Sequence, residues 1–239
     1  MQFRRQFTPA PAHPVVRWLV WILLGAGLTV AITTQIFAPA LGIYTPANLL
    51  SLSQWGISNG YLWQFLSFLF VVPAPLSFYF AFYLLIELYL IWVIGGLLVD
   101  RVGKGPFLRL FFTSGILAGA GALGLSALLG GGGALAGAAC AVYGLLVAWT
   151  LFDPDMQLLL FMMVPIRAKY LVLGLLGLNL LLDLSGGAYL YATANVIGAL
   201  VGYFYSVIGW DLRGPFSFTH PFDHWLGGMG HRIRRMFKK

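Results

Sequence analysis

The chain has 239 residues, of which 60% are hydrophobic and only 9% are charged. A soluble domain carries about 25% charged residues and lacks the interior to hide so much apolar surface, so the composition excludes a water-soluble globular protein. The formal net charge of +7 is consistent with membrane topology and attraction to anionic lipid, and it requires no nucleic-acid partner. The single cysteine excludes an internal disulfide and a cysteine-based metal site, and we expect no metal and no cofactor.

Six apolar runs predict membrane-spanning helices, since a helix needs about 20 apolar residues to cross the hydrocarbon core. They lie near residues 16–38, 76–99, 106–129, 135–152, 165–183 and 187–209. The first run is longer than the apolar part of a secretory signal and has no small-residue cleavage site, so we interpret it as an uncleaved span. The predicted fold is an all-α, six-helix membrane bundle over residues 15–210. An N-terminal tail, 1–14, and a basic aromatic C-terminal tail, 211–239, flank it.

A long first loop, residues 39–75, separates the first two predicted spans. It is apolar but is broken by several prolines and glycines, and it contains Trp55, Tyr61 and Trp63. Breaks of this kind together with interfacial aromatic residues predict a loop that is partly embedded in the membrane.

The distribution of Lys and Arg predicts the orientation, because cytoplasmic loops carry an excess of these residues. With six spans, all 14 fall on one side: Arg4, Arg5, Arg17, Arg101, Lys104, Arg109, Arg167, Lys169, Arg213, Arg232, Arg234, Arg235, Lys238 and Lys239. The loop 39–75 and the turns at 130–133 and 185–187 contain none. We therefore expect a positive-inside protein with both termini in the cytoplasm, located in a bacterial plasma (inner) membrane.

Small residues recur in the fourth and sixth predicted spans. Gly137, Gly144, Gly198 and Gly202 are the most prominent of them. Small residues at a spacing of about four allow two helix backbones to come close, so these glycines predict helix packing.

The same glycines belong to longer motifs. Residues 137–144 read Gly-Ala-Ala-Cys-Ala-Val-Tyr-Gly, and residues 194–202 begin Ala-Asn and continue with Gly198 and Gly202. In chain order they join Trp63-Gln64, the turn from Gly95 to Gly103, and the segment from Asp153 to Val172. The set resembles the rhomboid family of intramembrane serine proteases. That family has Gly-x-Ser-Gly-Ala-x-x-Gly in its fourth span and Ala-His-x-x-Gly-x-x-x-Gly in its sixth.

The chain departs from this family at the catalytic positions. Ala139 stands where the resemblance implies the nucleophilic serine, and Asn195 stands where it implies the histidine base. Hydrolysis by this route needs a hydroxyl group whose proton is removed by an adjacent base. The four histidines, His13, His220, His224 and His231, all lie in the predicted cytoplasmic tails. The residues therefore favour a protein that is not an enzyme.

The neighbouring candidates do not replace the missing groups. Cys140 follows the nucleophile position, but one residue turns a helix by about 100°, so we expect its thiol to point elsewhere and to be structural. In the second span, the resemblance implies a His-x-x-x-Asn pair of oxyanion donors. Counting from Trp63 places this pair at Ser77 and Ala81, whereas counting back from Gly103 places it at Tyr83 and Glu87. Both counts lack the histidine.

Two acidic residues lie in predicted spans. Glu87 has no Lys or Arg at its depth, so we expect its carboxyl group to be protonated or hydrogen-bonded to Asn195, Asn179, Ser114 or a tyrosine. Because acids inside a membrane are expensive, Glu87 is a candidate functional residue. Asp183 lies near the outer end of the fifth span, and we expect a solvated helix terminus there.

Three functions are compatible with these residues. The favoured hypothesis is a noncatalytic rhomboid-like protein that binds transmembrane segments of client proteins. The resemblance implies a lateral entrance formed by the second and fifth spans with loop 39–75, and a cavity lined by Ala139, Cys140 and Asn195. The alternatives are a serine-type intramembrane peptidase with a non-standard site, and a small transporter or channel that uses Glu87. The lipid bilayer is a partner under each hypothesis, and the oligomeric state stays open.

Overall fold

The computed structural model describes residues 13–37, 45–72, 76–160 and 164–210, together with residues 212, 214, 224 and 228. The main helices are α1 (Pro14–Ile32), α6 (Phe78–Val102), α7 (Lys104–Leu128), α8 (Ala139–Phe152), α9 (Ala168–Ser185) and α10 (Tyr189–Trp210). The shorter elements are η1 (Thr33–Phe37), α3 (Pro46–Leu50), β1 (Leu52–Ser53), α4 (Gln54–Ser58), α5 (Gln64–Ser67), η2 (Phe68–Phe70), β2 (Ala134–Leu135), β3 (Gln157–Leu160) and β4 (Val164–Arg167).

In the described part of the chain, five helices are long and apolar enough to cross a bilayer, namely α1, α6, α7, α9 and α10. The sixth apolar helix, α8, has only 14 residues. At 1.5 Å per residue it is about 21 Å long, which is shorter than a hydrocarbon core of about 30 Å. The arrangement confirms an all-α membrane protein.

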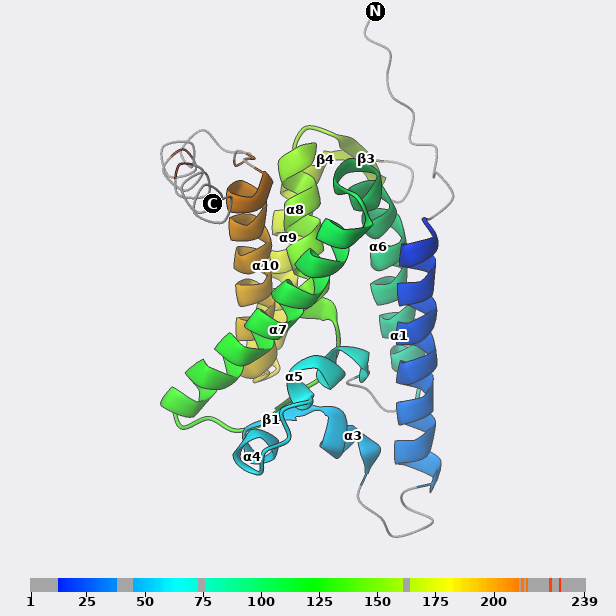
Figure 1. The fold of residues 1–239 in the computed structure, drawn as a ribbon, viewed down its shortest axis with the longest axis vertical. Helices are drawn as coiled ribbons and strands as arrows, with labels where there is room; N and C mark the ends of the chain where they lie inside the picture. Colours follow the sequence, from blue (N-terminus) through cyan, green and yellow to red (C-terminus); the bar gives the residue numbers. More distant parts are fainter. Residues whose placement is uncertain are drawn as a thin grey trace, which may run out of the picture.

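Helix α8 is short because it lies inside the protein. It packs against α6, α7, α9 and α10 (Figure 1), and ten of its residues are buried. The span predicted from residue 135 begins instead at Ala139, because the preceding segment is not helical. Gly137 has a φ of 98°, and Ala134–Leu135 forms β2. A non-helical backbone at membrane depth is tolerated where protein rather than lipid surrounds it.

The segment from residue 45 to 72 folds against the start of α8, as Figure 1 shows. Strand β1 pairs antiparallel with β2, with Leu52 opposite Leu135, and the N–H of Gly137 donates to the carbonyl of Phe68 over 2.8 Å. Gln64 is fully buried in this segment, where it donates to the carbonyl of Leu49 over 3.1 Å. The part of the predicted loop 39–75 that the structure describes therefore contains three short α-helices. Residues 39–44 and 73–75 lie outside the described residues.

The closest approach between helices is that of α8 and α10. A methyl group added at Gly198 would collide with the carbonyl of Cys140, and one added at Gly202 would collide with the backbone of Gly144. Gly144 itself faces the side chain of Ser114 on α7. Backbones touch directly at these positions, as the spacing of small residues leads one to expect. Gly137 lies before α8, where its positive φ turns the chain into the helix.

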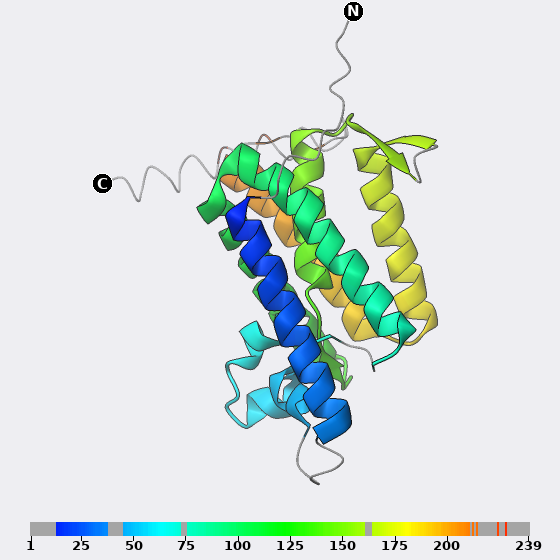
Figure 2. The same cartoon turned by 90° about the vertical axis from the view of Figure 1, so that its right-hand side faces the viewer.

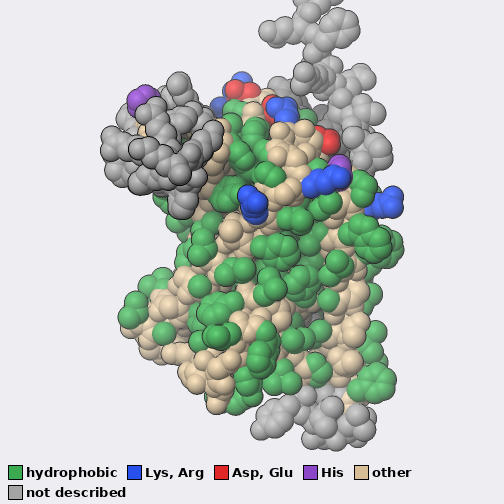
Figure 3. Space-filling model, in the orientation of Figure 1, with side chains coloured by type: hydrophobic (Ala, Val, Ile, Leu, Met, Phe, Trp, Pro, Cys, Tyr) green, Lys and Arg blue, Asp and Glu red, His purple; other side chains and the backbone are tan. Residues whose placement is uncertain are grey.

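Charged side chains gather at one end of the molecule, above a body covered by hydrophobic side chains (Figure 3). The end includes the hairpin of β3 and β4, in which Gln157 is opposite Arg167. Arg101 pairs with Asp153 over 2.6 Å, and Lys169 pairs with Asp155 over 3.1 Å. The hairpin also explains why the predicted fifth span, 165–183, starts too early. Pro165 lies in β4, and α9 begins only at Ala168.

We predict that Gly198→Ala destabilises the protein by about 1–3 kcal/mol, because its new methyl group meets the backbone of α8 rather than a side chain that can move. The measurement is reversible unfolding in mixed micelles, followed by tryptophan fluorescence. Gly96→Ala on α6 is the matched control, since a methyl group there meets nothing within 4 Å. Equal effects of the two substitutions would contradict the close α8–α10 contact.

Candidate functional site

Four of the predicted site residues lie around the N-terminus of α8. Ala139 is the first residue of this helix and is half-buried, and Cys140 is buried behind it. The carboxyl group of Glu87, on α6, faces the backbone N–H of Ala138, which precedes the helix. Asn195, on α10, is one turn before the glycine that touches Cys140. Three chain segments therefore meet where the resemblance implies a catalytic centre.

The Asn195 side chain is tied to α9. Its Nδ2 atom donates to Oδ1 of Asn179 over 2.8 Å and to Oδ2 of Asp183 over 3.1 Å. Asn179 and Asp183 are four residues apart and thus share one face of α9. Asp183 lies in the last turn of α9 and is partly exposed, and beyond the expected helix terminus its carboxylate also accepts a hydrogen bond from α10. The i,i+4 spacing of the two residues is the sequence signal that could have identified the pair.

Helix α9 is otherwise poorly buried. Its buried side chains are Ala168 and Val172, both in its first turns. Its later turns are joined to neighbouring helices by polar contacts, including a hydrogen bond of 3.4 Å from the hydroxyl of Tyr143 to the carbonyl of Leu175. The Asn179–Asp183–Asn195 cluster thus replaces apolar packing over the second half of α9.

Glu87 does not have the partners expected from the sequence. Its Oε1 atom is buried and has no hydrogen-bond partner among the described residues, and the same holds for the Oγ atom of Ser114. The prediction that Asn195 or Asn179 pairs with it is wrong, because both bond within the cluster on α9. Glu87 uses the α8 terminus instead, where unpaired N–H groups and the helix dipole attract an acidic group.

The position of Glu87 also bears on the two possible alignments of α6 with the His-x-x-x-Asn pair, counted forward from Trp63 or back from Gly103. Ser77 is the N-cap of this helix, and its hydroxyl accepts from the N–H of Phe80 over 3.3 Å. Tyr83 lies one turn before Glu87, and Glu87 is the residue that reaches α8. The geometry therefore agrees with the count back from Gly103, which puts Glu87 where the resemblance implies an oxyanion donor.

This arrangement lacks the parts of a nucleophilic centre. Ala139 offers a methyl group where a hydroxyl is needed, and the Asn195 amide is not a base. The carboxyl group at position 87 faces the N–H of Ala138 as an acceptor, whereas an oxyanion hole must present free donors. Cys140 has 2% of its surface exposed and packs in the hydrophobic core. The buried groups at the start of α8 belong to the packed core of the bundle.

Comparison with known families agrees with the order of the motifs. The family model described as Rhomboid domain matches residues 59–212, which is more than half of the chain. The matched region contains α6 to α10 and hence the whole site at the start of α8. No curated protein matches the chain significantly.

We predict that Asn195 and Asn179 are energetically coupled. A double-mutant cycle with Asn195→Ala and Asn179→Ala should give a coupling free energy of about 0.6 kcal/mol and at most about 1.7, the range for hydrogen bonds between membrane helices. The measurement is reversible unfolding in mixed micelles. Thr193→Val is the matched control on α10, since its hydroxyl bonds to carbonyls of its own helix. A coupling free energy no larger than that between Thr193 and Asn179 would contradict a stabilising hydrogen bond between Asn195 and Asn179.

Proposed function

Since this chain belongs to the rhomboid family, we propose that it is a noncatalytic member that binds transmembrane segments of client proteins. The observation that carries the proposal is the pair of residues at the catalytic positions, Ala139 and Asn195. The first removes the nucleophile, and the second is a hydrogen-bond donor to α9 instead of a proton acceptor. Under this proposal the chain keeps the family's fold but does not catalyse the family's reaction.

The proposal requires a surface through which a client helix enters. We infer that it lies between α6 and α9, which both pack against α8. These two helices expose many large apolar side chains: Phe78, Phe82, Leu85, Ile86 and Tyr89 on α6, and Tyr170, Leu173, Leu178, Leu181, Leu182 and Leu184 on α9. Figure 2 shows the two helices spreading apart toward the end that holds β3 and β4. A client segment lying between the two helices would run alongside α8 to Ala139, which is at the opposite end of α8 from β3 and β4.

The proposed topology has six spans, with α8 as the short central one. The described Lys and Arg side chains gather at the end of the molecule that also holds β3 and β4 (Figure 3). We propose that this end faces the cytoplasm, that both tails, 1–14 and 211–239, lie on the same side, and that the protein resides in a bacterial plasma membrane. The membrane domain is then residues 15–210, with its candidate site in the outer half.

We predict that a serine-reactive fluorophosphonate does not label the natural chain above a heat-denatured control. Ala139→Ser with Asn195→His should introduce weak labelling, because it restores a hydroxyl group beside a base. Adding Glu87→Asn should accelerate labelling up to about 100-fold, since an amide donor replaces the acceptor that faces Ala138. In-gel fluorescence measures each rate.

The control for this series is Cys140→Ser with Asn195→His, which places a hydroxyl one residue away, in the buried core, and should stay unlabelled. Heat-sensitive labelling of the natural chain would overturn the noncatalytic proposal in favour of a peptidase with a non-standard site.

We predict that a photoreactive residue in place of Phe78 crosslinks to single-span membrane proteins co-reconstituted in liposomes. The control is the same residue in place of Leu128. The two side chains are 87% and 85% exposed, and they lie at the same end of the antiparallel pair α6 and α7. Capture at least several-fold above the control is expected, and it is measured by mass spectrometry. Equal capture at both positions would show nonspecific contact and would contradict the proposed entrance.

The competing proposal is a small transporter or channel, which the unpartnered Glu87 Oε1 atom favours. An acid that carries protons or ions must exchange with water during each cycle. Glu87→Gln would then alter ion-coupled flux in liposomes, whereas a client-binding protein should show background flux with either side chain.

A further inference from the structure

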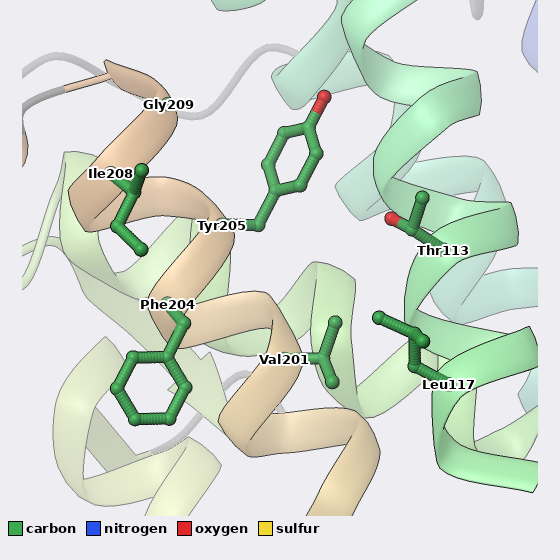
Figure 4. A pocket seen from close by; sticks show the side chains of 7 residues that line it. All are labelled: Thr113, Leu117, Val201, Phe204, Tyr205, Ile208 and Gly209. Carbon is green, nitrogen blue, oxygen red and sulfur yellow. The ribbon is translucent and has the colours of Figure 1, made fainter. Parts of the chain in front are cut away.

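A groove separates α7 from α10 on the membrane-facing side, away from the start of α8 (Figure 4). Its volume is about 550 Å³, which lies within the range of roughly 300–1,000 Å³ that is typical of small-molecule sites. Leu117 on α7 and Phe204 on α10 line it and are 52% and 37% exposed. The groove therefore opens toward the place that lipid occupies around a membrane bundle.

The groove changes in polarity along its length. Toward the end of α10, the Tyr205 ring stands between the two helices, and Thr113 points into the groove from α7 (Figure 4). Farther from that end, Leu117 and Val201 face one another, and the lining is apolar. A ligand that fits is apolar over most of its length, and a polar part can lie only at the end next to Thr113 and Tyr205.

Arg109 supplies a charge at the polar end. It precedes Thr113 by one helical turn, and the Thr113 hydroxyl donates to its carbonyl over 2.6 Å, so the two residues and Leu117 share one face of α7. Side chains on a helix tilt toward its N-terminus, which directs the guanidinium from the groove toward the charged end of the molecule. Arg109 is exposed, and no carboxylate among the described residues forms a salt bridge with it.

We propose that this groove is a binding site for an anionic glycerophospholipid of the leaflet at the charged end of the molecule. The phosphate binds Arg109, the glycerol region lies beside Thr113 and Tyr205, and an acyl chain fills the space between Leu117 and Val201. Such a lipid matches both the polarity gradient and the depth of the charge, since Arg109 lies about 7.5 Å below the start of α7 at 1.5 Å per residue.

Charge complementarity selects this occupant over a protein segment. The chain that follows α10 carries six Lys or Arg residues and two Asp residues, so this tail would bring positive charge to Arg109. A client helix would need an acidic side chain at that depth, which is costly in a membrane segment. An anionic lipid brings negative charge to this depth without that cost. The site is independent of client binding and would persist if that proposal failed.

The test uses the full chain with the photoreactive amino acid benzoylphenylalanine in place of Leu117, in liposomes of equal parts phosphatidylglycerol and phosphatidylcholine. Mass spectrometry measures the ratio of the two lipid adducts. We expect phosphatidylglycerol adducts to be enriched about fivefold, the effect of one basic side chain near a membrane surface. The same probe in place of Leu128, at the far end of α7, should show no enrichment.

Charge substitutions complete the test. Arg109→Gln should abolish the enrichment, whereas Arg109→Lys should retain it. Lys104→Gln is the matched control, since it removes a cation from the same helix end without touching the groove face. Enrichment that survives Arg109→Gln, or that is lost equally with Lys104→Gln, would overturn the site. Adducts to residues after 215, to a second copy of the chain or to another protein would also overturn it, because they would identify a different occupant.

Discussion

The direct backbone contact between α8 and α10 is the constraint on which the rest of the structure depends. At Gly198 and Gly202 there is no room for even one methyl group, because carbonyl groups of α8 already occupy the space. This contact allows a helix of 14 residues to lie in the centre of the bundle, surrounded by longer helices that face lipid. The N-terminus of α8 therefore lies inside the protein, where its unpaired N–H groups are available to side chains of neighbouring helices.

The hydrogen-bond acceptors that lie next to these N–H groups determine the chemistry of the site. A buried helix terminus can present its donors to a developing oxyanion, or the protein's own acceptors can occupy them. Here the Glu87 carboxyl group faces the N–H of Ala138, and Asn195 turns its amide toward Asn179 and Asp183. The hydrogen bonds of Asn195 join α10 to α9. The polar cluster is best understood as a structural link to α9, which has little apolar packing over its later turns.

Much of the fold could be predicted from the sequence, and the reasons for the errors are physical. Hydropathy located the long helices to within a few residues, because a lipid-facing helix must be apolar over its whole length. It misplaced the start of α8, since a segment buried in protein is equally apolar whether it is helical or not. The same limitation hid β2 and the β3–β4 hairpin, whose residues continue an apolar run. The α8–α10 contact was predictable because small residues at fixed spacing have few other uses.

The partners of polar residues were harder to predict than the residues themselves. Glu87 and Asn195 stand out in an apolar sequence, but hydropathy does not say which face of a helix meets which neighbour. The expected hydrogen bond between Glu87 and Asn195 is absent, because Asn179 and Asp183 on α9 accept both hydrogen bonds that the Asn195 amide donates. Two polar residues four apart in a span lie on one helix face and can share a partner on another helix. For predicting such a partner, the spacing is more useful than the identity of either residue.

The two ends of the bundle present different chemistry to the membrane. At the start of α8, polar groups are enclosed and mutually bonded, so a ligand there would have to displace internal hydrogen bonds or rely on apolar contact with Ala139. Between α7 and α10, by contrast, Arg109 lies beside an open apolar groove, with no carboxylate partner among the described residues. An enclosed polar cluster stabilises one conformation, whereas an unneutralised charge beside an apolar surface attracts an amphiphile of opposite charge. Lipid recognition at the second place therefore requires no rearrangement of the first.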